Sequence, residues 1–293
     1  MKSIGRKIKE NLDVFDEAIS KFLREHVSIY YKKRSIEGFL IIGYSDYNWH
    51  ELSEDGKRVQ TIIYKDLIKF FELINLFLKG QPEKYQKEFK SATKDIKWAL
   101  LQDGQVWNSN IDEVISKVHS SFDEIKKILN NQYIDNPQGL IIVPDTNALI
   151  SNIYLDKWNF DEIPAFDIIL LPTVLAELDK LKINHRNPDV REKVTKLIRY
   201  IKELRRRGKL TEGVTVTSNI KIKAIAVEPN MEDSLSWLDE NNDDDRIIAS
   251  FIEVSREYLN HEIVLVTSDI NLQNKAEFSL IDTIEPPTFY EEI

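Results

Sequence analysis

Short aliphatic runs alternate with helical stretches through the second half of the chain. The runs are "LIIV" from residue 140, "DIILL" from 167, "IVLVT" from 263 and "LIDTI" from 280, with a β-rich patch, "GVTVTSNIKIKAIAVE", from 213. Between them, the pattern predicts helices near 147, from Pro172, from Asp189 to Arg207, from Asp243 and after Ser268. Such runs are typical of strands buried on both faces, and their alternation with helices favours a parallel sheet between helical layers. We therefore predict an α/β fold for this half.

The first half of the chain is predicted to be mostly helical. Apolar residues recur at helical spacing over Ile4–Tyr30, Gly56–Leu78, Pro82–Leu101 and Ile111–Asn131. The stretch "IEGFLIIGYSDYNWHE" from residue 36 breaks this spacing and predicts one strand and a loop that carries Trp49 and His50. Turn residues in "NQYIDNPQG", 131–139, indicate a linker. We predict a mostly α-helical N-terminal domain over residues 1–137 and an α/β domain over residues 138–293.

The composition narrows the classes of function. The chain has no cysteine, which excludes disulfides, thiol nucleophiles and cysteine-bound zinc and fits a cytoplasmic protein. A formal net charge of −9 argues against a generally basic nucleic-acid binder, although a local basic patch stays open. No apolar run approaches the roughly eighteen residues of a membrane span, and the N-terminus lacks the apolar core of a secretory signal. We expect no membrane partner.

Acidic residues stand where the chain leaves the predicted strands. Asp145 and Asp269 directly follow two of them, Glu177 lies one turn into the helix after "DIILL", and Asp243–Asp245 open the helix "RIIASFIEV". Ligands bind at this carboxyl edge in open α/β sheets. Asp145 by itself fits a helix N-cap, but four converging acids repel one another unless a cation neutralises them. Oxygen ligands without histidine or cysteine suit Mg²⁺ or Mn²⁺, which activate water for attack on a phosphodiester.

Four segments, taken in order, resemble the motifs of PIN-domain nucleases. They are "VPDTNALI", "LPTVLAELDKLK", "NDDDRIIAS" and "LVTSDINLQNKA", and the last two are most similar to PIN domains attached to PhoH-type ATPases and to those of RNA-decay factors. The resemblance covers residues 139–287 and implies a three-layer domain around a central parallel, twisted sheet. It does not extend to the first 137 residues, and the chain has no P-loop motif of an attached ATPase.

The resemblance also implies a set of site residues. When the family's site residues are transferred motif by motif, the resemblance implies that the catalytic metal ligands are Asp145, Glu177, Asp244 and Asp269, with Asp245 as a further ligand. It implies that Thr146, Asn147 and Asn271 support these ligands. Which of Asp243, Asp244 and Asp245 takes the third position stays open, as does the number of ions. The implied cofactor is Mg²⁺ or Mn²⁺, and the implied reaction is endonucleolytic hydrolysis that leaves 5′-phosphate and 3′-hydroxyl ends.

A basic segment suggests how a nucleic acid could be held. Residues 191–209, "REKVTKLIRYIKELRRRGK", contain nine lysines and arginines against two glutamates. Such a run is often only the solvated face of a helix, but close to Glu177 it also fits a track for phosphates. We predict that the track is formed by Lys202, Arg205, Arg206 and Arg207. By resemblance the substrate is single-stranded RNA, and single-stranded or flapped DNA is the alternative.

Three other functions fit the sequence less well than a nuclease. A PIN-like module that binds RNA or a protein without cutting would differ in having no divalent-metal-dependent cleavage. A haloacid-dehalogenase-type phosphatase needs an acid two residues after Asp145, where Asn147 stands. Ser151 and Ser268 have no histidine partner placed by sequence, so a hydrolase triad has no support, and the five histidines show no paired spacing. For the helical half we expect a homo-oligomer contact or a regulatory partner.

Overall fold

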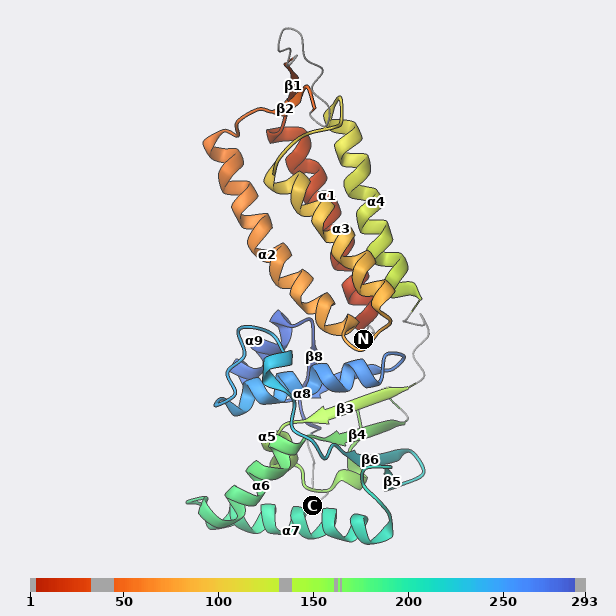
Figure 1. The fold of residues 1–293 in the computed structure, drawn as a ribbon. Helices are drawn as coiled ribbons and strands as arrows, with labels where there is room; N and C mark the ends of the chain where they lie inside the picture. Colours follow the sequence, from red (N-terminus) through yellow and green to blue (C-terminus); the bar gives the residue numbers. More distant parts are fainter. Residues whose placement is uncertain (1–3, 33–44, 132–138, 161–162, 164, 288–293) are drawn as a thin grey trace. The chain divides into compact units, whose positions relative to one another are not determined.

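The computed structural model describes residues 4–32, 45–131, 139–160, 163 and 165–287, and the chain divides into two compact units (Figure 1). The N-terminal unit is Lys7–Tyr133, and the C-terminal unit consists of Met1–Arg6 and Ile134–Ile293. Most of the predicted linker, 131–139, lies outside the described residues. No described helix is long and apolar enough to cross a membrane.

Four helices make up most of the N-terminal unit: α1 (Ile4–His26), α2 (Glu54–Leu78), α3 (Glu83–Leu101) and α4 (Ile111–Asn130). Each buries one apolar stripe, with Phe22, Ile74, Ile96 and Phe122 almost fully covered. The side chain of Ser53 accepts a hydrogen bond from the first turn of α2, which fixes where that helix begins. The predicted helical character of this half is therefore confirmed.

A short hairpin in this unit corrects two details of the sequence analysis. The first helix ends at His26, not Tyr30, because the following backbone joins an antiparallel ladder of β1 (Ile29–Tyr31) and β2 (Tyr47–Trp49). Trp49 therefore lies in a strand and not in a loop. The aromatic side chains favour this pairing, since the tilted rings of Tyr30 and His50 contact each other with centroids 4.5 Å apart. The first part of the predicted strand, residues 36–44, lies outside the described residues.

A six-stranded sheet forms the centre of the C-terminal unit. Its strands are β3 (Leu140–Pro144), β4 (Phe166–Leu170), β5 (Val214–Thr215), β6 (Ile220–Ala224), β7 (Glu262–Val266) and β8 (Asp282–Ile284), in the order β5-β6-β4-β3-β7-β8. Every neighbouring pair is parallel except β5 and β6, which are antiparallel. The predicted parallel sheet is confirmed, with one reversed strand at its edge. All five residues of β3 are buried, as expected for a central strand.

Helices cover both faces of this sheet (Figure 1). They are α5 (Thr146–Ser151), α6 (Pro172–Asn184), α7 (Pro188–Arg207), α8 (Asp243–Glu257) and α9 (Ile270–Phe278), with two 3₁₀ turns, η1 (Leu155–Lys157) and η2 (Met231–Asp233). Helices α5, α6 and α7 pack together on one side, and α8 and α9 pack together on the other. This is the predicted three-layer architecture.

The strand order determines where a site can form. From β3 the chain moves outward through β4 to β6, and it later returns to the other side of β3 through β7 to β8. Because parallel crossovers are right-handed, this reversal sends the helices after β3 and after β7 to opposite faces. The carboxyl ends of β3 and β7 therefore lie at the switch point of the sheet, the position at which α/β proteins bind ligands.

Candidate functional site

Asp145 lies at this switch point, directly after β3. One oxygen of its carboxylate, Oδ1, accepts a hydrogen bond from the Ala148 backbone N–H at 2.6 Å, so Asp145 is the N-cap of α5. The other, Oδ2, accepts from the Thr267 hydroxyl at 2.5 Å. The residue is only 3% exposed, and no lysine, arginine or histidine of the described chain forms an ion pair with it. Asp145 is thus both a cap and a buried carboxylate without a counter-ion.

Burial has an electrostatic consequence for Asp145. It raises the pKa of this carboxyl, because a desolvated charge is disfavoured, and the hydrogen bonds from Thr267 and Ala148 only partly oppose this effect. The negative charges of Asp269 and Glu177 raise the same pKa further. The three acids therefore share one electrostatic neighbourhood, and a cation placed among them would relieve the repulsion.

Glu177 and Asp269 are each held by a hydrogen bond near a helix start. The Thr146 hydroxyl, in the first turn of α5, donates to Glu177 Oε2 on α6 at 2.5 Å. Asp269 caps α9, because its Oδ1 accepts from the backbone N–H groups of Asn271 at 2.8 Å and Leu272 at 3.1 Å. Both carboxylates are thereby oriented by groups on neighbouring elements or in the adjacent turn.

Thr267 is a site residue that the sequence analysis missed. Its hydroxyl donates to Asp145 and also accepts from the backbone N–H of Asp269 at 3.0 Å. One buried side chain at the end of β7 therefore links the two aspartates that follow β3 and β7. The signal in the sequence was the spacing "TSD", since a threonine two residues before a helix cap commonly bonds the local backbone.

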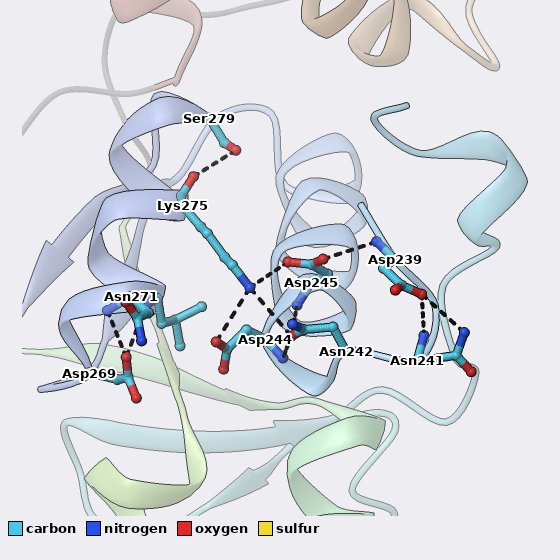
Figure 2. A network of polar contacts seen from close by, with 10 residues as sticks. Asp239, Asn241, Asn242, Asp244, Asp245, Asp269, Asn271, Lys275 and Ser279 are labelled. Atoms are coloured by element: carbon cyan, nitrogen blue, oxygen red, sulfur yellow. Dashed lines mark hydrogen bonds and ion pairs between the residues drawn. The ribbon is translucent and has the colours of Figure 1, made fainter. Parts of the chain in front are cut away.

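The three aspartates that open α8 lie in different surroundings, and Figure 2 shows two of them, Asp244 and Asp245. Asp243 pairs with Arg246 at 3.1 Å. Asp245 is buried, with Oδ2 accepting from the Asp239 N–H at 3.0 Å and Oδ1 lying 2.7 Å from the Lys275 ammonium. Asp244 is less enclosed, and its Oδ2 lies 3.5 Å from the same ammonium. Asp244 and Asp245 thus contact a lysine of α9, whereas Asp243 pairs with an arginine of its own helix.

Lys275 carries its charge in this position. Partial burial by itself would lower the pKa of the ammonium, but the contacts with Asp245 and then Asp244 outweigh it and leave the pKa raised. Lys275 therefore supplies one positive charge between two carboxylates in the first turn of α8.

The predicted acids thus fall into two groups. Asp145, Glu177 and Asp269 influence one another, whereas Asp244 and Asp245 surround Lys275. Among the described residues, no group of three or more histidine, aspartate or glutamate side chains is arranged to hold a metal ion. The chemistry of the donors nevertheless fits Mg²⁺ or Mn²⁺, because such an ion keeps several waters and needs only one or two carboxylates. The role of these acids as ligands stays a prediction.

The remaining predicted residues lie around this edge of the sheet. Asn147 and Asn271, proposed as supports, are exposed in the first turns of α5 and α9. Arg205, Arg206 and Arg207 are exposed at the end of α7, as is Lys202 one turn earlier.

The three arginines line a cavity of about 550 Å³. Its other walls include Leu175, from the first turn of α6, and Ala224–Ala226, which leave the carboxyl end of β6. Since Glu177 lies on the same helix as Leu175, the basic cavity and the acidic residues belong to the same edge of the sheet.

A separate polar cluster lies in the N-terminal unit. Asp16 Oδ1 is 2.7 Å from His119 Nδ1, and His119 Nε2 is 3.5 Å from the Ser20 hydroxyl. Residue spacing in the sequence does not predict this pairing. Ser20 is 3% exposed in the interior of α1, where the helix itself takes up the backbone N–H groups, so the backbone beside Ser20 does not form an oxyanion hole. The cluster joins α1 to α4 and does not form a hydrolase site.

Comparison with known families gives one match. Residues 142–286 match a family model described as PIN domain. The match spans β3 to β8 and includes every predicted acid, and the N-terminal unit stays unassigned. The comparison with curated proteins found no match to the chain.

Proposed function

Residues 142–286 belong to the PIN domain family, a family of metal-dependent nucleases, and on this premise we propose that the protein is a divalent-metal-dependent endonuclease that cuts single-stranded RNA. The observation that carries the proposal is the Asp145 carboxylate, which is buried at the switch point of the sheet beside two further acids and forms no ion pair with any residue that the structure describes. A capping role alone does not require Glu177 and Asp269 to lie near it.

In this proposal Asp145, Asp244 and Asp269 hold Mg²⁺ or Mn²⁺, and Glu177 orients the attacking water. Asp245, next to Asp244, is a less favoured ligand. A bound ion of this kind supplies positive charge that lowers the pKa of water and offsets the charge on the scissile phosphate. Thr146 fixes the direction of the Glu177 carboxylate through their hydrogen bond. Thr267 does the same for Asp145, which keeps both carboxylates in one orientation before substrate binds.

The test is incubation of the purified full chain with labelled single-stranded RNA and single-stranded DNA of equal length. We expect endonucleolytic cleavage of RNA with Mn²⁺ or Mg²⁺, products with 5′-phosphate ends, and no cleavage in EDTA. Binding of RNA without cleavage under every metal condition would favour a non-catalytic module. Preferential cleavage of DNA would change the substrate but keep the reaction.

The same assay on residues 138–293 tests the proposed domain boundary. All the proposed ligands lie in this fragment, and about 150 residues can bury a sufficient core, so we expect it to fold and to cut with the same metal dependence. We propose that the helical unit serves assembly or regulation, which sedimentation of the fragment beside the full chain would reveal. An insoluble or inactive fragment would argue that the two halves depend on each other.

A third prediction concerns the basic end of α7. Replacing Arg205, Arg206 and Arg207 with glutamine should weaken binding to every single-stranded sequence, because phosphate contacts are independent of sequence. The slope of log affinity against log salt should flatten by about 0.7 for each lost contact. Fluorescence anisotropy over a series of salt concentrations measures both quantities.

The matched control removes three positive charges elsewhere. Lys84, Lys87 and Lys90 are exposed on α3, far in sequence from the proposed site, and their replacement with glutamine should leave the slope unchanged. Equal slopes for the arginine variant and the wild type would show that the basic run of α7 is only a solvated helix face.

A further inference from the structure

Lys275 links the two acidic helix starts of the proposed site. It lies on α9, the helix that Asp269 caps, and its side chain reaches into the first turn of α8 (Figure 2). Its ammonium is 2.7 Å from Asp245, 3.5 Å from Asp244 and 3.4 Å from Oδ1 of Asn242, the N-cap of α8. A single side chain of α9 therefore contacts two of the three aspartates in the first turn of α8 and the N-cap of that helix.

Asp245 and Asp244 differ in how closely they contact the Lys275 ammonium and in how far they are buried. The side chain of Asp245 is 8% exposed, and its two oxygens face the Asp239 N–H and the ammonium. The side chain of Asp244 is 34% exposed, and its contact with the ammonium is longer by 0.8 Å, from 2.7 Å to 3.5 Å. Asp244 can therefore turn toward another cation at small cost, whereas turning Asp245 would break its hydrogen bond with the Asp239 N–H as well as its closer contact with the ammonium.

We propose that Lys275 is a positioning residue that acts as the protein's own counter-ion at the metal site, with Asp245 as its permanent partner and Asp244 as the carboxylate it releases to a divalent cation. This inference rests on the proposed nuclease function. It assigns Asp244, of the three aspartates on α8, to the metal. It also implies that the lysine and the metal neutralise the same carboxylate.

Because the Lys275 ammonium and the divalent cation share the Asp244 carboxylate, the presence of one affects the binding of the other. When Lys275 is removed, the acidic turn is left with uncompensated charge, so a divalent cation gains more by binding there. Any ligand that binds only the folded state stabilises it, and the stabilisation increases with affinity. A variant without the lysine should therefore be less stable without metal but respond more strongly to it.

The experiment compares Lys275→Met with the wild type in the full chain, by thermal unfolding over a titration of Mn²⁺. Without metal we expect the melting temperature of the C-terminal unit to fall by about 4 °C or more. The Mn²⁺ concentration at half of the full stabilisation should fall by about 5-fold or more, a typical size for coupling between two sites. Lys275→Arg retains the charge and should behave as the wild type.

Two further variants make the result specific. Lys182→Met makes the same exchange at an exposed position of α6 and should leave the Mn²⁺ midpoint unchanged. In an Asp244→Asn background, Lys275→Met should no longer shift that midpoint, because the shared carboxylate is already neutral. A shift that persists in that background would overturn the assignment of Asp244. If Lys275→Met does not fold, Lys275→Gln, which keeps a hydrogen-bond donor, takes its place.

The outcomes separate this inference from the nuclease proposal. An equal Mn²⁺ midpoint in the wild type and Lys275→Met overturns the role of the lysine, whether or not RNA is cut. No stabilisation of either protein by Mn²⁺ overturns the metal site and this inference together. If the Mn²⁺ midpoint shifts in Lys275→Met but no nucleic acid is cut, the inference is supported and the nuclease proposal alone is refuted.

Discussion

Asp145→Asn abolishes metal-dependent cleavage while the protein without metal stays folded. We expect a fall in rate of more than about 100-fold, because losing even a group that hydrogen-bonds a metal ligand costs about 10–100-fold. The asparagine oxygen can still accept from Ala148, so the cap of α5 is retained. Cleavage of labelled RNA with Mn²⁺, beside circular dichroism of both proteins, measures the two effects separately.

The stability of this variant depends on the sign of the pKa shift. Because burial raises the pKa of Asp145 in the folded state, the folded protein holds the proton more tightly than the unfolded chain. The resulting penalty is absent below the unfolded pKa of 3.8 and is complete once the pH exceeds the folded value. At neutral pH and without metal, Asp145→Asn should therefore unfold at the same or a higher urea concentration than the wild type.

The matched control is Asp167→Asn, an exposed aspartate on β4 of the same sheet. It makes the same chemical change away from Asp145, Glu177 and Asp269, and it should affect neither cleavage nor the response to Mn²⁺. If Asp145→Asn cuts RNA at the wild-type rate, Asp145 is only a helix cap. If it unfolds, the carboxylate is needed for the fold itself.

Thr267→Val should impair both the fold and the proposed reaction. The valine has nearly the same shape but neither donates to Asp145 nor accepts from the Asp269 N–H, so a buried carboxylate and a half-buried backbone N–H lose a partner. Leaving such groups unpaired costs about 1–3 kcal/mol each. Because both aspartates also lose orientation, cleavage should fall by about 10–100-fold. Urea unfolding and the Mn²⁺-dependent cleavage rate measure the two losses.

Two other variants show whether the hydroxyl is the cause. Thr267→Ser keeps the hydroxyl and should recover most of the cleavage rate. Thr195→Val removes a hydroxyl that donates to the Arg191 carbonyl within α7, and it should leave cleavage unaffected. A Thr267→Val protein with the wild-type rate would mean that backbone geometry alone holds Asp145 and Asp269 in place.

The sheet and its helices were predictable because burial imposes a regular pattern on the sequence. The all-buried β3 appears as an aliphatic run, and α7 shows a one-sided stripe of apolar residues. The reversed direction of β5 was not predictable, since its two residues carry no signal of orientation. The end of α1 was also missed, because helical spacing continues by chance into the backbone that pairs as β1.

The candidate site was predictable only in part, for a similar reason. An acid directly after a strand can be found by eye, as Asp145 and Asp269 were. The contribution of Thr267 depends on the register of two strands, which pairs Pro144 with Val266 and so brings Thr267 beside Asp145. The reach of Lys275 depends on how α9 packs against α8. Neither relation is encoded in local spacing.

The short strands at the two ends of the sheet have a consequence for solubility. An edge strand offers unpaired backbone groups to other chains, and long flat edges promote aggregation. Here the outermost strands are β5, with two residues, and β8, with three. Each leaves room for few intermolecular backbone hydrogen bonds, so the sheet is a poor template for strand addition. The C-terminal unit is therefore protected from edge-to-edge association even though its central strands are among the most apolar segments of the chain.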